Sequence, residues 1–160
     1  RVMITFTVPG QPQGKGRHRS AALMRDGKPV IGPGGRPIVT THTPEKTVAY
    51  EGLIAHSGRV AMAGRTMLLE PCGCRVLIDC QIPASWSGKK QRQALAGEVM
   101  PKAKPDTDNV IKAVFDGLNG VVWRDDVLVV DLHVRKRFAA TPGVRVEVWA
   151  LDAPLTGDLQ

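Results

Sequence analysis

Long apolar runs, cysteines and acidic residues are all scarce in this sequence of 160 residues. No stretch reaches the roughly 18 consecutive apolar residues that a transmembrane helix needs. The opening residues, RVMITFTVPG, alternate as a strand does and lack the apolar centre of a signal peptide. We therefore expect a cytoplasmic protein without a membrane segment.

The three cysteines are too few for a disulfide-stapled fold, and an odd number agrees with a reducing compartment. Cys72 and Cys74 are separated by one residue, whereas zinc-binding pairs are usually separated by two to four. Cys80 lies on a predicted strand. The sequence thus favours buried or unreactive thiols over a zinc site.

The shortage of acidic residues, 15 against 22 basic ones, gives a net charge of +7. Such an excess in a soluble chain indicates a polyanionic partner, most often nucleic acid. Residues 11–37 hold six basic residues and one acid, and residues 89–104 hold five and one. Either block alone could be a solvated surface. The cations that we expect to contact nucleic acid are Lys15, Arg17, Arg19, Lys89, Lys90, Arg92, Lys104 and Arg135.

The acidic residues that are present concentrate in one stretch, KPDTDNVIKAVFDGLNGVVWRDD, at residues 104–126. Apolar residues at helical spacing predict a helix that starts near Asp108 and stops near Asn119. Carboxylates gathered at the ends of buried elements repel one another unless a cation bridges them, and Mg²⁺ prefers such oxygen ligands. The alternative is that these residues only cap the helix and form a turn. The five acids are Asp106, Asp108, Asp116, Asp125 and Asp126.

The remaining patterns predict one α+β domain over residues 1–151, followed by a frayed tail at 152–160. We expect a mixed sheet of four to five strands with two main helices. The predicted strands cover residues 3–8, 74–82, 127–134 and 144–149, and residues 20–40 contain the turn signals of a hairpin. The last strand is expected to lie antiparallel to the one before it. In that preceding strand, the apolar residues expected to face the core are Leu128, Val130, Leu132 and Val134.

Helices are expected after Thr43 and within residues 85–100. Thr43, Pro44 and Glu45 have the order of an N-cap, a first-turn proline and a first-turn acid, which predicts a helix that runs to about Met62. Glycine at position 58 makes a break near Ser57 possible. Residues 85–100 are expected to form a short helix or an ordered loop. We assign no functional role to His42 or His56.

The 104–126 stretch resembles the signature of the RusA family of Holliday junction resolvases, small Mg²⁺-dependent endonucleases found in bacteria and often in prophage-derived regions. The shared pattern is P-D-x-D-N-x-x-K, then D-x-L, then D-D at the start of a strand. The resemblance implies that Asp106, Asp108 and Asp126 bind metal and that Lys112 is the essential basic residue. Asp125 and Asp116 would be auxiliary at most.

The function expected from this resemblance is the cleavage of four-way DNA junctions by paired symmetric nicks, with Mg²⁺ or a substituting Mn²⁺. Because a four-way junction is approximately two-fold symmetric, one active site per chain implies a homodimer. No small-molecule cofactor is expected. Two other classes stay open: a metal-dependent nuclease for another branched or flap DNA, and a nucleic-acid-binding module whose carboxylates only shape the fold.

Overall fold

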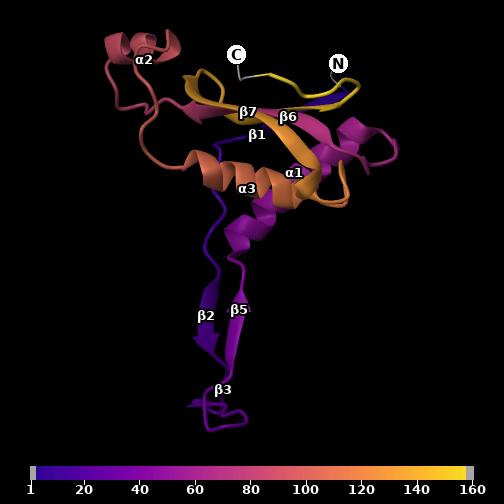
Figure 1. Ribbon diagram of the computed structural model, residues 1–160. Helices are drawn as coiled ribbons and strands as arrows, with labels where there is room; N and C mark the ends of the chain where they lie inside the picture. The colour runs from indigo at the N-terminus through magenta and orange to yellow at the C-terminus, as the bar shows by residue number, and fades with distance from the viewer. Residues whose placement is uncertain (1–2, 158–160) are drawn as a thin grey trace.

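The computed structural model describes residues 3–157 and shows an α+β body from which a long two-stranded arm projects (Figure 1). The body has a four-stranded mixed sheet, with helices α1 and α3 packed together on one face of it. The arm, residues 17–42, carries only short strands. The body elements are β1 (Ile4–Pro9), α1 (Glu45–Met62), β6 (Cys72–Gln81), α2 (Gly88–Leu95), α3 (Thr107–Leu118), the 3-10 turn η1 (Asp126–Leu128), β7 (Val129–Ala139) and β8 (Gly143–Ala150). The arm strands are β2 (Arg19–Ala22), β3 (Met24–Arg25), β4 (Lys28–Pro29) and β5 (Val39–His42).

The strand order in the sheet is β1-β8-β6-β7. β8 pairs antiparallel with both β1 and β6, whereas β6 and β7 are parallel and are joined through α3. The last two strands therefore run antiparallel as expected, but they do not pair as a hairpin, because β6 lies between them and the link at residues 140–142 passes over its end. Side-chain alternation identifies a strand but does not identify its neighbour. The α+β class and the four-stranded mixed sheet are confirmed.

The core lies between this sheet and the two long helices. Alternate residues of β6 from Cys72 to Cys80 are buried and face the helices, together with Val114 of α3 and Ile54 of α1. The two helices approach closely at glycines: a Cβ on Gly117 would lie 2.8 Å from a side-chain carbon of Ile54. A close approach of this kind fixes α3 against α1 and so fixes where the acidic residues of α3 are presented.

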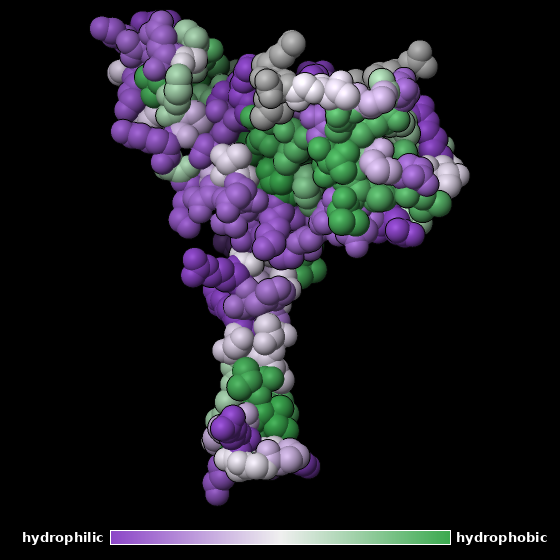
Figure 2. All heavy atoms as spheres, in the orientation of Figure 1, coloured by the Kyte–Doolittle hydropathy of each residue, from purple (hydrophilic) through white to green (hydrophobic). Residues whose placement is uncertain are grey.

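Strand β7 differs from its expected burial. Val130, Leu132 and Val134 were predicted to face the core, but their exposed fractions are 52%, 41% and 37%. These side chains lie on the same face of the sheet as α1 and α3. They stay exposed because β7 is at the edge of the sheet and α3 packs against β6 instead. Figure 2 shows the result as a continuous apolar area over β7.

Helix α1 spans the predicted residues, but two details of its prediction are wrong. Thr43 does not cap the helix; its hydroxyl lies 3.3 Å from Nδ1 of His18 in the arm. The helix also continues through Gly58 without a break, because this glycine packs on α3, where an added Cβ would lie 2.7 Å from Leu118. Gly58 therefore allows α1 and α3 to pack closely and does not end α1.

The three cysteines all lie on β6 and are free and buried. Burial raises the pKa of the Cys74 thiol to about 12, so this thiol stays protonated and unreactive at neutral pH. Within residues 3–157, no helix combines the length and the apolar character that crossing a bilayer requires. Of the expected C-terminal tail, residues 152–157 form no helix or strand, and 158–160 lie outside the described residues.

Candidate active site

The N-terminus of α3 presents two carboxylates. Asp106 occupies the N-cap position in an extended conformation, and its carbonyl accepts the first helical hydrogen bond from Val110 N. Its side chain makes no capping bond and instead accepts from Asn109 Nδ2 at 3.4 Å. Asp108 is exposed in the first turn. The positive end of the helix dipole stabilises both negative charges, and both carboxylates are free to bind a ligand.

The segment before α3 is held in place by β7. Lys136 Nζ donates to the carbonyl oxygens of Ala103 at 2.9 Å and of Pro105 at 3.0 Å. The carbonyls of a loop would otherwise bond to water, so a single ammonium fixes the approach of the chain to Asp106. The end of β7 and the beginning of α3 thus form one unit.

A cleft of about 580 Å³, here called the α3 cleft, opens beside Asp106. One wall is the start of α3 with its preceding loop, and the other is the segment at residues 11–17 that leads into the arm. Backbone contact joins the walls, since Lys15 N donates to the carbonyl of Asn109 at 2.9 Å. The cleft combines a carboxylate with the cations of Lys104 and Arg17, which is the mixture that a metal ion and a phosphate require.

Lys112 is exposed one turn inside α3. Together with Arg17 and His18, it lines a second hollow next to the α3 cleft. Lys112 is four residues from both Asp108 and Asp116, a spacing at which a simple ion pair along the helix would be possible. Among the residues that the structure describes, Lys112 forms no such pair within 4 Å. Its ammonium group is therefore available to a bound anion.

Asp116 is paired with Lys15, a residue expected to contact DNA. Lys15 Nζ donates to the Asp116 carboxylate and also lies 3.4 Å from Glu51 Oε1. The hydrogen bond to Asp116 and the charge of Glu51 raise the pKa of Lys15 above its ordinary value, although burial opposes them. This ammonium ties the cleft wall to α1 and α3, so it is engaged within the chain, although Lys15 still lines the cleft. The role of Glu51 was missed, because these partners are far apart in the sequence.

Asp125 and Asp126 lie at the opposite end of α3. Asp125 caps the 3-10 turn by accepting from Val127 N at 3.1 Å. The carboxylate of Asp126 accepts from Nδ2 of Asn119, the C-cap residue of α3, at 3.4 Å. Asn119 is in turn fixed by Trp123, whose Nε1 donates to Asn119 Oδ1 at 2.9 Å.

Within one chain, Asp126 is therefore separated from Asp106 and Asp108. The 12 residues of α3 span about 18 Å at 1.5 Å each. The expectation that these carboxylates meet where the helix and the strand begin is wrong for a single chain. In a parallel β6-α3-β7 crossover the helix runs against the strands, so the start of α3 and the start of β7 lie at opposite ends. Across residues 3–157, no three His, Cys, Asp or Glu side chains gather at one point in the chain as a metal would need.

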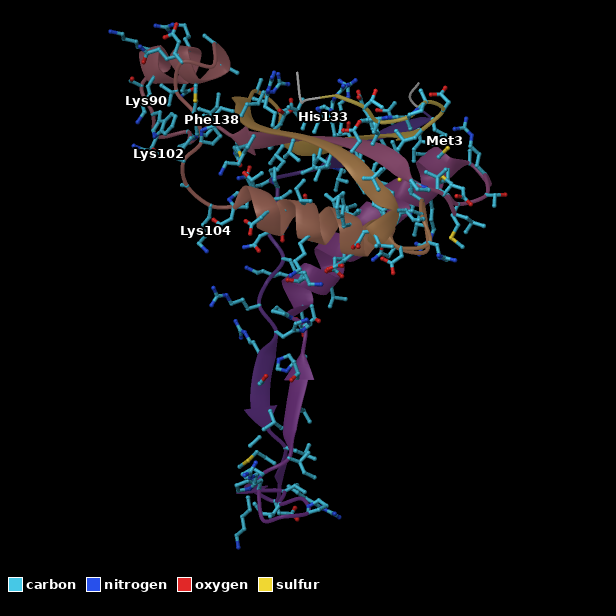
Figure 3. All side chains as sticks on the ribbon, viewed as in Figure 1. Met3, Lys90, Lys102, Lys104, His133 and Phe138 are labelled. Atoms are coloured by element: carbon cyan, nitrogen blue, oxygen red, sulfur yellow. The ribbon has the colours of Figure 1, made fainter. Side chains whose placement is uncertain are left out.

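The second basic block lies on and beside α2. Lys90 Nζ lies 3.9 Å from the centre of the Trp86 ring, which packs edge-on against Phe138 of β7. Figure 3 shows Lys90, Lys102 and Lys104 along one side of the molecule, between α2 and the start of α3. Lys89 and Arg92 belong to the same short helix.

The remaining predicted DNA contacts divide between two places. Arg17 and Arg19 are exposed at the base of the arm, and Arg17 lines the α3 cleft. Arg135 is exposed on β7 opposite Leu77, so it points away from the helical face that carries the cleft. The structure therefore brings the arm base and Lys104 together with Asp106 but leaves Arg135 apart.

A family model described as endodeoxyribonuclease RusA matches residues 9–149. The chain belongs to the RusA family. The matched range includes the arm, the α3 cleft and both ends of α3, so the likeness first suggested by the 104–126 stretch is confirmed over most of the chain. This RusA chain is also 34% identical over 154 residues to the uncharacterized protein YqaN of Bacillus subtilis (strain 168). The aligned region covers 94% of this chain and 98% of YqaN.

RusA nucleases are metal-dependent, and the residues at the start of α3 fit a hard divalent ion. Asp106 and Asp108 supply carboxylate oxygens, and neither is consumed by an ion pair within the described chain. Mg²⁺ usually takes one or two protein carboxylates and completes its octahedron with water and phosphate. The donor chemistry therefore suits Mg²⁺ better than zinc, which prefers sulfur and nitrogen.

Proposed function

We propose that this chain is a Mg²⁺-dependent, structure-selective endodeoxyribonuclease that resolves four-way DNA junctions by paired symmetric nicks. The observation that supports this proposal best is the α3 cleft, where the Asp106 carboxylate at a helix N-terminus lies together with the cations of Arg17 and Lys104. Family membership supports DNA as the substrate. Mn²⁺ should substitute for Mg²⁺, because it accepts the same oxygen ligands.

In this proposal Asp106 and Asp108 would hold the metal ion, and a bound ion would supply activation of a water molecule and neutralisation of charge on the scissile phosphate. Asn109 holds the Asp106 carboxylate through the bond at 3.4 Å and so limits its rotation. Lys112 places its ammonium near the negative charge that develops on the phosphate during displacement. Arg17 and Lys104 bind the neighbouring phosphates from the two walls of the cleft.

The third carboxylate, Asp126, belongs to the same site only if a second chain supplies it. β7 is an edge strand whose outer backbone groups are unpaired in the sheet. If two copies of β7 pair antiparallel about a two-fold axis, the start of each strand lies beside the end of the other. The end of β7 is where Lys136 holds Pro105, next to Asp106. The partner's Asp126 then approaches the Asp106 and Asp108 of this chain.

The surface of β7 supports a second copy as its occupant. Val130, Leu132 and Val134 form an exposed apolar stripe on one face of the strand. An exposed apolar edge strand is a template for pairing and would promote aggregation if it stayed uncovered. A two-fold contact covers the stripe with itself, which satisfies the self-complementarity that a symmetric dimer requires. The dimer then carries two composite active sites, one for each of the opposed strands of a junction.

The test is to incubate the protein with a labelled four-way junction, a linear duplex and a flap of the same sequence in Mg²⁺, in Mn²⁺ and in EDTA. The proposal expects paired nicks in the junction with either metal and none in EDTA. Preferred cutting of the flap would indicate a nuclease for another branched DNA. Binding of all three substrates without any cutting would indicate a non-catalytic binding module.

A further inference from the structure

The arm has a feature that the proposed active site does not use: its far end is apolar and uncovered. All four arm strands are exposed along their whole length. The exposed fractions of Met24, Ile31 and Val39 are 54%, 54% and 59%. Figure 2 shows a separate apolar area near the end of the arm, remote from the apolar area over β7.

The arm end is nevertheless an ordered structure. Leu23 N donates to Ile38 O and Val30 N donates to Leu23 O, each at 2.7 Å. Asp26 and Gly27 both have positive φ, 51° and 74°, as a two-residue type I′ hairpin turn requires. Backbone bonds therefore hold the end in shape without a core of its own. A lone two-stranded ribbon is only marginally stable in water, so such an element gains from a partner that covers it.

The charge of the arm identifies the kind of partner. Residues 17–42 hold five lysine and arginine residues and one acid, Asp26. Arg17 and Arg19 lie at the base, and Arg25, Lys28 and Arg36 surround the apolar end, so cations accompany the whole length. The arm of a second copy carries the same excess of cations and would repel this one. A polyanion attracts it, and the major groove of duplex DNA, about 12 Å wide, admits a two-stranded β-ribbon.

The base of the arm fixes where such a duplex would lie. Arg17 lines the α3 cleft, and Gly16 N is anchored to Thr47 Oγ1 of α1 at 2.9 Å. From Arg17 to Arg25 the chain extends about 26 Å at 3.3 Å per residue. This length corresponds to about eight base pairs, since a helical turn of about 34 Å holds roughly ten.

We propose that the arm is a groove-binding element for one duplex arm of the DNA substrate. Its cations contact phosphates along the groove. Its apolar end contacts base edges, such as thymine methyl groups, about eight base pairs from the phosphate in the α3 cleft. This inference rests on the proposed function, because it takes the phosphate in the cleft as its reference point. It adds that the enzyme requires a minimum length of intact duplex beside the cut.

The test measures binding in EDTA, so that it does not depend on cleavage. Junctions with arms of about 20 base pairs, two helical turns, are compared with junctions trimmed to about five. The charge variant combines Arg25→Gln, Lys28→Gln and Arg36→Gln. A control variant removes three exposed cations elsewhere, by Arg59→Gln, Arg75→Gln and Arg145→Gln.

Wild-type and control proteins should bind the long junction at least about tenfold more tightly than the trimmed one. In the charge variant, most of this difference in affinity between the two junctions should disappear. Its slope of log affinity against log salt concentration should become shallower by up to about 2.7, at 0.9 per phosphate contact. A second variant, Met24→Gln with Ile31→Gln, should lower the ratio and keep the slope, because apolar contacts release no counterions.

An unchanged length ratio in the charge variant would overturn the inference. So would a shift of either arm variant from dimer to monomer in sedimentation, because the arm would then clasp a second chain. Failure of the proposed function has a different signature: wild-type protein would cut no branched DNA in Mg²⁺, whatever the EDTA binding ratios show.

Discussion

Asp108 is exposed in the first turn of α3, so its carboxylate can bind a metal ion without contributing to the packing of the helix. Asp108→Asn keeps the shape of the side chain but removes the charge that the ion requires. We expect cleavage of a four-way junction to fall below detection while binding in EDTA is kept, since the repulsion of phosphate is reduced. Equal loss of binding and cleavage in a folded variant would contradict a catalytic role.

Lys15 and the pair Arg17 and Arg19 are close in sequence but are expected to respond differently to substitution. Arg17→Ala with Arg19→Ala removes exposed cations, so the slope of log affinity against log salt should become shallower by up to about 1.8. Lys15→Ala should leave that slope unchanged and lower the free energy of unfolding by about 1 kcal/mol, because Asp116 and Glu51 lose their partner. Binding titrations at several salt concentrations and urea unfolding measure the two effects.

A pH series provides the control for the Lys15 result. The pKa of Lys15 is raised in the folded state above the ordinary value of 10.5, so its stabilisation is complete below pH 10.5 and is lost as the pH rises beyond it. The difference in unfolding free energy between wild type and Lys15→Ala should therefore shrink at high pH. A difference that is constant to pH 12 would mean that the ammonium charge contributes nothing.

These residues show how far a sequence motif can be interpreted. The spacing of Asp106, Asp108 and Lys112 placed them correctly at the start of a helix, because helical geometry relates positions a few residues apart. The ion pair of Lys15 with Asp116 joins positions 101 residues apart, and no local rule relates them. The same limit applies to Asp126, whose distance from Asp108 depends on the direction of the crossover.

The contact between α1 and α3 depends on glycine, and two glycines allow a matched test. A Cβ at Gly117 of α3 would lie 2.8 Å from Ile54 and 3.0 Å from the carbonyl oxygen of Glu51, whereas a Cβ at Gly52 of α1 would meet nothing within 4 Å. Gly117→Ala should therefore lower the free energy of unfolding by about 1–3 kcal/mol. Gly52→Ala should raise it by about 0.5–1 kcal/mol, because alanine favours the helix. Stabilisation of both variants in urea unfolding would contradict close helix packing.

The elements themselves were largely predictable, but their neighbours were not. Alternation correctly identified β6, with Val76 and Ile78 buried, and the proline and first-turn acid at Pro44 and Glu45 located the start of α1, although Thr43 does not cap it. The same alternation in β7 showed that Val130, Leu132 and Val134 share one face, but it could not show that the helices leave this face uncovered. Burial depends on the layer above a strand, and that layer comes from elsewhere in the chain.

At the scale of the whole molecule, the apolar stripe on β7 should determine the oligomeric state. Leu132 is 41% exposed in the single chain, so Leu132→Glu should cost little stability but place two charges against each other at the proposed two-fold contact. We expect the variant to sediment as a monomer and to lose junction cleavage at the same protein concentration. Leu155→Glu, at a position 56% exposed in the C-terminal segment, is the control. A Leu132→Glu variant that remains dimeric would exclude this surface.

The central claim is that each active site combines Asp108 of one chain with the partner's Asp126. The two positions lie at opposite ends of α3, about 18 Å apart in one chain. Asp108→Asn and Asp126→Asn chains should therefore each be inactive alone. A mixed dimer has one site with both substitutions and one site with neither, so mixing the two variants should restore activity.

The measurement is cleavage of a cruciform plasmid by the two variants, separately and after subunit exchange, with differently tagged chains to quantify the mixed dimer. The account predicts that the mixture converts the plasmid to open circles, because each mixed dimer nicks one strand, whereas wild type gives linear DNA. A mixture that stays inactive although mixed dimers are recovered would contradict the composite site and place all the catalytic carboxylates within one chain.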